Sequence, residues 1–279
     1  MPSTETRIPQ TPSDDLLTVA AIAMLAFIFA DVAHEGLGHG LGFYFAGGKS
    51  SLLTTTRLIV WTTLPDPQWR VFDLGGPAGN MAAALLARLG LRLFRTRPVH
   101  LRFFLWLVMA FSLFWAFGYL IFCGVTGRGD WMALIDGSRF LTVGRVLFVV
   151  LGIVLYRLSI RLLVNELLWI VPRHSINAKA RVARLIPLSY LFGGLIACSG
   201  AILDPRGAIE VLRSGALSSF GAAVGLLAVP VIFARSPEKL ADPAEAPITR
   251  HLAWILAAAA ASIYYIWILG PGILMWFGG

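Results

Sequence analysis

Seven long apolar stretches dominate this chain and restrict what it can fold into. They cover residues 16–45, 72–94, 101–124, 140–164, 185–203, 208–234 and 251–278. A helix that crosses the hydrocarbon core of a bilayer needs about 20 mainly apolar residues, and each stretch is close to or above that length. Charged residues make up only 14% of the chain, whereas they make up about 25% of soluble domains. The sequence therefore predicts an all-α polytopic membrane protein with about six to eight transmembrane helices.

The segment between the first two apolar stretches has a different pattern. It reads SLLTTTRLIVWTTLPDPQWR over residues 51–70, where Thr, Ile, Val and Trp favour a strand and Pro65 and Pro67 end it. We expect a short β-ribbon over residues 51–64 at the membrane face, directly after the first helix. An exposed strand edge of this kind can bind an extended peptide by strand addition.

The polar segments indicate how the chain sits in the membrane. Residues 1–15, MPSTETRIPQTPSDD, lack the basic start and apolar core of a signal peptide, so we expect a polar tail. Lys and Arg are more numerous in the segments that lie on the same side of the membrane as the N-terminus. This bias predicts that the N-terminus is inside, and we expect a prokaryotic plasma membrane as the location. Since most basic residues lie in short loops, we expect the net charge of +8 to serve contact with the lipid bilayer and not nucleic acid.

Three ionisable residues, His34, Glu35 and His39, lie inside the first apolar stretch. Such groups are costly within a membrane span and usually face the bundle interior or a water-filled cavity, which makes them candidates for function. Imidazole and carboxylate are zinc ligands, and a carboxylate beside the ion can act as general base on water. The two cysteines lie apart in apolar stretches, so any metal must be held by histidine and carboxylate.

The spacing of the two histidines is one residue wider than the H-E-x-x-H pattern of zinc helices. In a regular α-helix, five steps of about 100° turn His34 and His39 about 140° apart, so they cannot share an ion. We favour a π-helical turn, which accommodates one additional residue and which the interleaved glycines make less costly. A second possibility keeps the α-helix and uses Glu35 with His39 as ligands, leaving His34 for proton transfer. A third is that both histidines only contact neighbouring helices.

Three stretches together resemble the site-2-protease-like family of intramembrane zinc metallopeptidases. AHEGLGHGLGFYFAGG (33–48) is similar to the family's His-Glu motif with one added residue. GGPAGNMAAALLARL (75–89) is similar to its Gly-Pro-x-x-Asn segment, and GRGDWMALIDGSRFL (127–141) lies where the family carries an aspartate ligand. The motifs occur in the family's order and cover about the first half of the chain.

The resemblance implies a function and a set of site residues. His34, His39 and Asp130 would hold Zn²⁺, Glu35 would activate water, and Asn80 would position the scissile peptide or its oxyanion. The substrate would be a membrane protein or peptide. The predicted orientation places the span ends that carry these residues on one side of the membrane, where they can converge. Residues 16–165 would form the metallopeptidase-like core, and residues 166–279 would add accessory or gating helices.

Two aspartates compete for the third ligand position. We favour Asp130, because the sequence GRGD can cap the start of the following helix and fix the carboxylate there. Asp136, in LIDGSRFL, is the alternative. Asp31 is a candidate acceptor for a histidine ring N–H, since ligating imidazoles usually donate their second nitrogen to such a group.

Two other functions remain open at this point. The chain can be a non-catalytic zinc-binding membrane scaffold of the same family. A membrane di-iron oxidoreductase is a weaker alternative, because such enzymes need several further histidine boxes and only three isolated histidines remain in the sequence.

Overall fold

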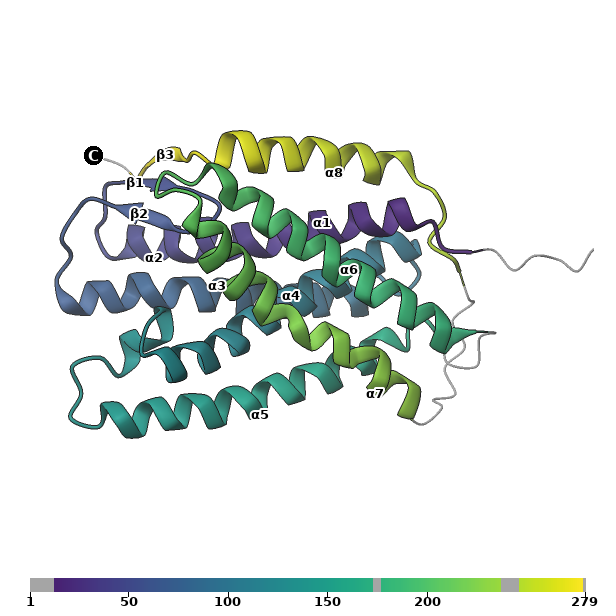
Figure 1. The fold of residues 1–279 in the computed structure, drawn as a ribbon, viewed down its shortest axis with the longest axis horizontal. Helices are drawn as coiled ribbons and strands as arrows, with labels where there is room; N and C mark the ends of the chain where they lie inside the picture. The colour runs from purple at the N-terminus through teal and green to yellow at the C-terminus, as the bar shows by residue number, and fades with distance from the viewer. Residues whose placement is uncertain (1–12, 173–176, 237–245, 278–279) are drawn as a thin grey trace, which may run out of the picture.

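The computed structural model describes residues 13–172, 177–236 and 246–277. Its long helices run roughly along one direction, and a small β-sheet lies at one end of the bundle (Figure 1). The α-helices are α1 Leu16–Val32, α2 Gly40–Phe45, α3 Asp66–Leu93, α4 Val99–Thr126, α5 Leu141–Leu167, α6 Ala178–Gly200, α7 Val229–Arg235 and α8 Leu252–Tyr264. The 3-10 and π-helical segments are η1 Ala33–His39, η2 Asp130–Leu134, η3 Ala201–Leu203, η4 Val211–Phe220, η5 Ala223–Ala228 and η6 Tyr265–Leu269.

Six helical stretches among the described residues are long and apolar enough to cross a membrane. They are Leu16–Phe45, Val99–Thr126, Leu141–Leu167, Ala178–Leu203, Val211–Arg235 and Leu252–Leu269. The predicted polytopic α-helical architecture is therefore confirmed. The predicted span 72–94 is not among the six, although α3 has 28 residues and lies beside α1 and α4. Its five charged side chains and many glycines make it less apolar than its neighbours.

The predicted β-ribbon is confirmed and gains a third strand. β1 Ser50–Leu53 pairs antiparallel with β2 Leu58–Val60 on one side and with β3 Ile273–Trp276 on the other, in the order β2-β1-β3. The prediction of one helical span over 251–278 is wrong at its C-terminal end. The helix stops at Leu269 because Gly270-Pro271-Gly272 follows, and proline cannot continue a helix.

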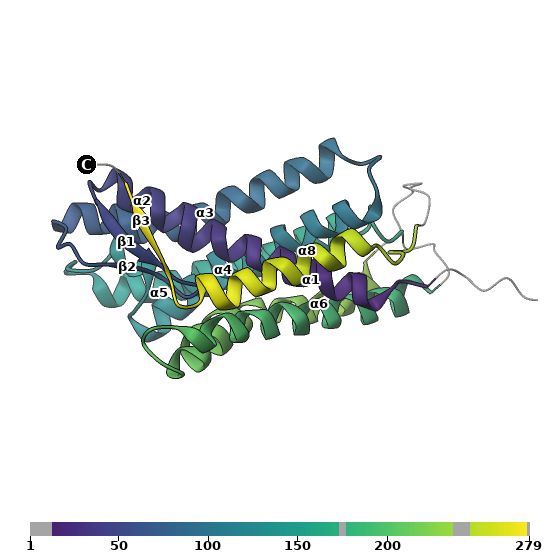
Figure 2. The ribbon, with the colours of Figure 1, turned by 90° about the horizontal axis from the view of Figure 1, so that it is seen from above.

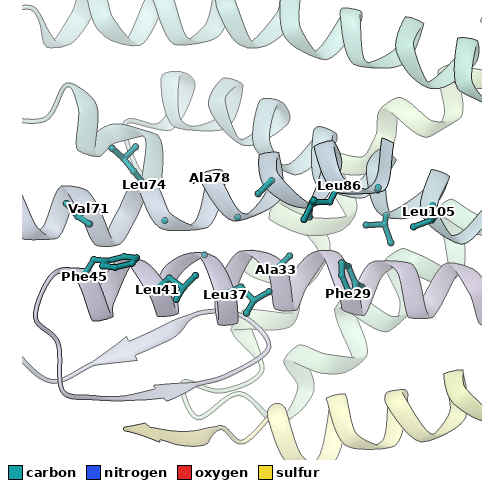
Figure 3. A pocket seen from close by; sticks show the side chains of 18 of the residues that line it. Phe29, Ala33, Leu37, Leu41, Phe45, Val71, Leu74, Ala78, Leu86 and Leu105 are labelled. Carbon is teal, nitrogen blue, oxygen red and sulfur yellow. The ribbon is translucent and has the colours of Figure 1, made fainter. Parts of the chain in front are cut away.

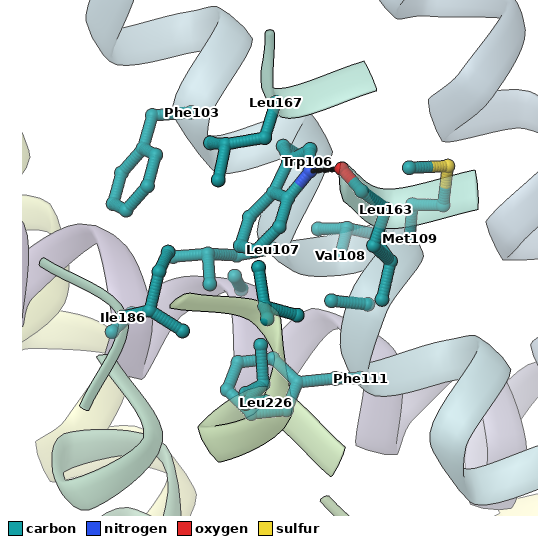
Figure 4. Packing of buried hydrophobic residues seen from close by; sticks show 14 of the residues in the cluster. Phe103, Trp106, Leu107, Val108, Met109, Phe111, Leu163, Leu167, Ile186 and Leu226 are labelled. Carbon is teal, nitrogen blue, oxygen red and sulfur yellow. Dashed lines mark hydrogen bonds between the residues drawn. The ribbon is translucent and has the colours of Figure 1, made fainter. Parts of the chain in front are cut away.

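The core of the bundle forms around α4, which is packed among α1, α3 and α5 and is therefore apolar on most sides. Phe103, Trp106 and Phe111 of α4 are fully buried. The indole N–H of Trp106 donates to the backbone oxygen of Leu163 over 2.9 Å, which ties α4 to α5 (Figure 4). Burying such large apolar side chains stabilises a fold by about 1.5–3 kcal/mol each in water, but inside a bilayer dense packing is the larger contribution.

The two predicted parts of the chain share this one bundle. The expected boundary at 165/166 falls inside α5, α6 and α8 pack against α1, and β3 completes the sheet that begins with β1. In Figure 2, α8 and α6 both lie along α1. The C-terminal helices therefore help to hold the first helix, which carries the predicted site.

Candidate metal centre

The first span changes from α- to π-helix at the histidine motif and then returns to α-helix. The π segment η1 covers Ala33–His39 and so includes both histidines. Five residues complete roughly one turn of a π-helix, which brings the two rings onto one face. Their centroids lie 4.9 Å apart with an interplanar angle of 86°. The predicted π-helical turn is confirmed, and the regular-helix alternative is excluded.

Glycines allow α3 to approach this segment at backbone distance. A Cβ atom on Gly38 would lie 2.5 Å from the backbone oxygen of Gly75, and one on Gly79 would lie 2.2 Å from that of Ala33. Any larger residue at Gly38 or Gly79 would push the two helices apart. The glycine content of both motifs therefore has a packing cause, and the contact brings α3 side chains to the histidines.

Each histidine makes a hydrogen bond through Nδ1, the ring nitrogen that does not face Asp130. Nδ1 of His34 lies 2.6 Å from Oδ1 of Asn80, and Nδ1 of His39 lies 2.9 Å from the backbone oxygen of Phe72. Amide and carbonyl oxygens only accept hydrogen bonds, so both Nδ1 atoms donate, and in the neutral rings that bind a metal both Nε2 atoms keep a free lone pair. This arrangement is typical of metal-ligating histidines.

Asn80 and Asp31 are placed differently from expectation. The amide nitrogen Nδ2 of Asn80 donates to the backbone oxygen of Ala30 over 3.0 Å, and the residue is fully buried. Asn80 therefore orients His34 and does not line the cavity that contains the histidines. Asp31 is the acceptor for neither histidine, and its buried Oδ2 atom has no hydrogen-bond partner among the described residues.

Asp130 faces both histidine rings from the loop after α4. Its Oδ2 atom lies 3.2 Å from Nε2 of His34 and 3.4 Å from Nε2 of His39. Its side chain does not cap η2, contrary to expectation: Gly129 takes the N-cap position with φ +103°. Asp136 is exposed, and its carboxylate accepts a hydrogen bond from the N–H of Gly137. The structure thus brings Asp130, and not Asp136, to the histidines.

The facing oxygen of Asp130 lies at ligand spacing from each of the two ring nitrogens. Zinc bonded tetrahedrally to nitrogen and oxygen at about 2.0–2.1 Å holds its ligand atoms about 3.3–3.4 Å apart. Oδ2 of Asp130 is at such distances from both Nε2 atoms, yet it has no hydrogen-bond partner among the described side chains. The ring nitrogens therefore converge on a point beside the oxygen and not on the oxygen itself. These residues fit a metal ion.

A glycine keeps the space in front of the two rings open. A Cβ atom on Gly76 would lie 2.5 Å from Nε2 of His39 and 2.7 Å from Nε2 of His34. Both nitrogens thus face the same small volume. Burial disfavours the charged form of Asp130, but the imidazoles of His39 and His34 outweigh this effect when they are protonated and hold the pKa of Asp130 well below its usual range.

Glu35 lies next to this group and, like Asp31 and Asp130, is a buried carboxylate with an oxygen that has no hydrogen-bond partner among the described residues. Donor atoms of His34, Glu35 and His39 all lie within 4.8 Å of one another. Glu35 is 8% exposed, and its Oε2 atom has no hydrogen-bond partner in the described part of the chain. A buried carboxylate oxygen without a partner is costly, which is expected where water or substrate supplies the partner.

Two cavities adjoin the histidine segment, and only one carries groups for chemistry. The first, of about 690 Å³, lies between α1–η1–α2 and α3 and has an entirely apolar lining that includes Phe29, Leu37 and Leu86 (Figure 3). The second, of about 840 Å³, contains His34, Glu35, His39 and Asp130 in its lining. The candidate site therefore opens into the second cavity.

The β1–β2 turn and η4 also line the second cavity. A polar network holds these two together: Arg206 pairs with Glu210 at 3.0 Å, and Thr56 donates to Asp204. Arg57 of the turn lies 3.8 Å from the same Glu210. This network was not predicted from the sequence. Its only indication in the sequence is that two acidic residues, Asp204 and Glu210, lie beside or within apolar stretches.

Comparison with known proteins finds no matching family model, no matching curated protein and no matching solved structure. A fold alone does not determine function, so function is inferred from the site.

Proposed function

We propose that this chain is an intramembrane zinc metallopeptidase of the site-2-protease-like type, which hydrolyses peptide bonds of membrane-protein substrates. One observation carries the proposal. Asp130 lies at ligand spacing from both histidine Nε2 atoms, while the hydrogen bonds of Nδ1 to Asn80 and to the Phe72 carbonyl fix the orientation of the two rings. Three protein ligands and an adjacent free carboxylate are the composition of a catalytic zinc site, which keeps its fourth position open.

Each residue has a separate task in this proposal. His34, His39 and Asp130 would hold the ion, and its chemistry there is Lewis acidity, which acidifies water and polarises a carbonyl. Glu35 takes a proton from the attacking water, since its carboxylate lines the same cavity and its Oε2 atom is free. Asn80 fixes the tautomer and direction of His34 and is a positioning residue.

The sheet offers a place for the substrate. β2 is an edge strand, because the order is β2-β1-β3, and Leu58 at its start lines the cavity with the metal centre. An extended peptide could pair with the free edge of β2 through backbone hydrogen bonds, as a fourth strand would. Such a peptide would extend toward the site. Intramembrane cleavage requires such an extended substrate, because a helix hides its peptide bonds.

The two alternative functions have weaker support. A di-iron centre needs further clustered ligands, but the described residues contain one group of three or more histidine, cysteine or acidic side chains that could hold a metal. His100 and His251 lie next to each other with ring centroids 5.1 Å apart, without a third such group, and His174 lies outside the described residues. A non-catalytic zinc scaffold has no need for the free, buried Glu35 carboxylate in the cavity.

Metal analysis and cleavage assays on detergent-purified protein test the proposal. We expect about one zinc per chain in the wild type, loss of zinc in His39→Ala, and zinc without cleavage in the nearly isosteric Glu35→Gln. Cleavage would be followed by mass spectrometry on a library of membrane-protein peptides in micelles. Zinc without cleavage by the wild type would favour the scaffold, and two irons per chain would favour the oxidoreductase.

A further inference from the structure

The proposed reaction needs a hydrogen-bond donor for the substrate oxygen, and Asn80 cannot supply one. Its amide nitrogen donates to the backbone oxygen of Ala30, its amide oxygen accepts from His34, and the fully buried side chain does not line the cavity. We propose that the hydroxyl of Tyr119 is a further catalytic residue, which donates a hydrogen bond to the scissile carbonyl oxygen as negative charge develops on it. This inference rests on the proposed function and adds a group that none of the three sequence motifs contains.

Tyr119 reaches the metal centre from α4. Its ring lies 6.4 Å from that of His34 in an edge-to-face arrangement, and it stacks on Phe122 at 5.5 Å with an interplanar angle of 12°. These two contacts fix the ring in one orientation, and the residue lines the cavity that contains Glu35 and Asp130. The hydroxyl is thus preorganised, which is what stabilisation of developing charge requires.

The hydroxyl lies against the residue that precedes the aspartate ligand. A Cβ atom on Gly129 would be only 2.6 Å from the Tyr119 hydroxyl oxygen and 2.8 Å from Sγ of Cys123. Gly129 therefore has two reasons to be glycine: its φ of +103° and the space taken by Tyr119. Asp130, Glu35 and Arg57 line the same cavity as Tyr119, so the hydroxyl lies within the field of the proposed active site.

Several other donors that line the cavity already have acceptors. The hydroxyl of Thr126 donates to the backbone oxygen of Phe122 over 2.8 Å, and that of Ser214 donates to Glu210 over 2.7 Å. Tyr119 differs, because its hydroxyl makes no hydrogen bond to any described residue. A phenol that lines the cavity beside His34 without a partner is free to donate to a ligand.

The reaction balances without any further reagent. Water adds to the scissile carbonyl carbon and gives one proton to Glu35, a new C–O bond forms, and the C=O π electrons move to the carbonyl oxygen. The Tyr119 O–H donates a hydrogen bond to that oxygen and keeps its proton. The C–N bond then breaks, the π bond reforms, and the proton held by Glu35 passes to the leaving amine.

Tyr119→Phe is the direct test, because it removes one oxygen and keeps the ring contacts. Losing one donor to a developing oxyanion costs about 10²–10³ in kcat, so we expect kcat to fall about 100-fold with KM and zinc content unchanged. A second readout does not depend on turnover. Titration calorimetry with a phosphinic peptide, which mimics the charged tetrahedral carbon, should show about 100-fold weaker binding to Tyr119→Phe, while a product peptide binds equally.

Tyr44→Phe is the matched control, since Tyr44 is 51% exposed on α2, does not line the cavity and should behave as the wild type. Wild-type kcat in Tyr119→Phe would overturn the inference while leaving the proposed function intact. A parallel loss of zinc or of thermal stability in this variant would also overturn it, because it would show a structural role. Absence of cleavage by the wild type would overturn the proposed function, and the catalytic role of Tyr119 with it.

Discussion

Adding a single methyl group at Gly76 should abolish metal binding without changing the fold. In Gly76→Ala, the new Cβ atom would lie 2.5 Å from Nε2 of His39 and 2.7 Å from Nε2 of His34. Unbonded heavy atoms approach to about 3.5 Å, so the rings would have to retreat by roughly 0.8–1 Å. Metal sites tolerate deviations of about 0.2 Å in ligand distances.

The rings of His34 and His39 have no easy way to retreat. Their Nδ1 atoms are bonded to Asn80 and to the Phe72 carbonyl at 2.6 and 2.9 Å, and retreat would break these bonds. Loss of one such support costs about 10- to 100-fold in metal affinity. With two rings displaced, we expect zinc affinity to fall at least about 100-fold.

Chelator competition and thermal unfolding in detergent measure the two effects of Gly76→Ala separately. Since alanine is preferred over glycine in a helix by about 1 kcal/mol, we expect the zinc-free variant to be no less helical than the wild type. Gly40→Ala is the control, because its Cβ would be 3.9 Å from the nearest side chain. If Gly76→Ala binds zinc like Gly40→Ala, the two nitrogens do not share one ion and the reasoning is refuted.

Three further changes test the remaining parts of the site. Asp130→Ala should abolish zinc binding while Asp136→Ala stays within about twofold of the wild type, and equal effects would contradict the ligand assignment. Asn80→Ala should lower zinc affinity about 10- to 100-fold in a chelator titration with the circular dichroism spectrum unchanged, and unchanged affinity would mean that Asn80 does not orient His34. Deleting Leu37, which is 57% exposed, should restore a regular helix and keep zinc bound, whereas zinc loss equal to that of His39→Ala would exclude a local π turn.

Hydropathy was enough to predict most of the fold, because a membrane span is defined by length and apolar content. It failed where apolar residues serve another element. The strand Ile273–Trp276 is as apolar as a span, and only the preceding Gly-Pro-Gly separates it from the helix. In α3, conversely, charged residues such as Asp73 and Arg88 lower the mean hydropathy of a helix that still packs within the bundle.

The site was predictable to the extent that its residues are adjacent in sequence. His34, Glu35 and His39 form a local pattern, whereas Asp130 and Asn80 were found only through resemblance. The support of His39 is a backbone oxygen, which any residue possesses, so no sequence pattern could indicate it. Tyr119 sits near the end of a span, where aromatic residues usually anchor the membrane interface, and that ordinary explanation hides its place in the cavity.

The added residue between the histidines is confined to one segment of the first helix. In a continuous α-helix, one inserted residue would rotate everything after it by about 100°. Phe43, four residues beyond the motif, is nevertheless fully buried, and a Cβ on Gly42 would lie 2.8 Å from the Val71 backbone oxygen. The face of α2 that carries Gly42 therefore still packs against α3, as it would without the inserted residue. Because the π-helical segment absorbs the extra residue, both rings and the helix beyond them keep their contacts, and the wide spacing is compatible with one shared ion.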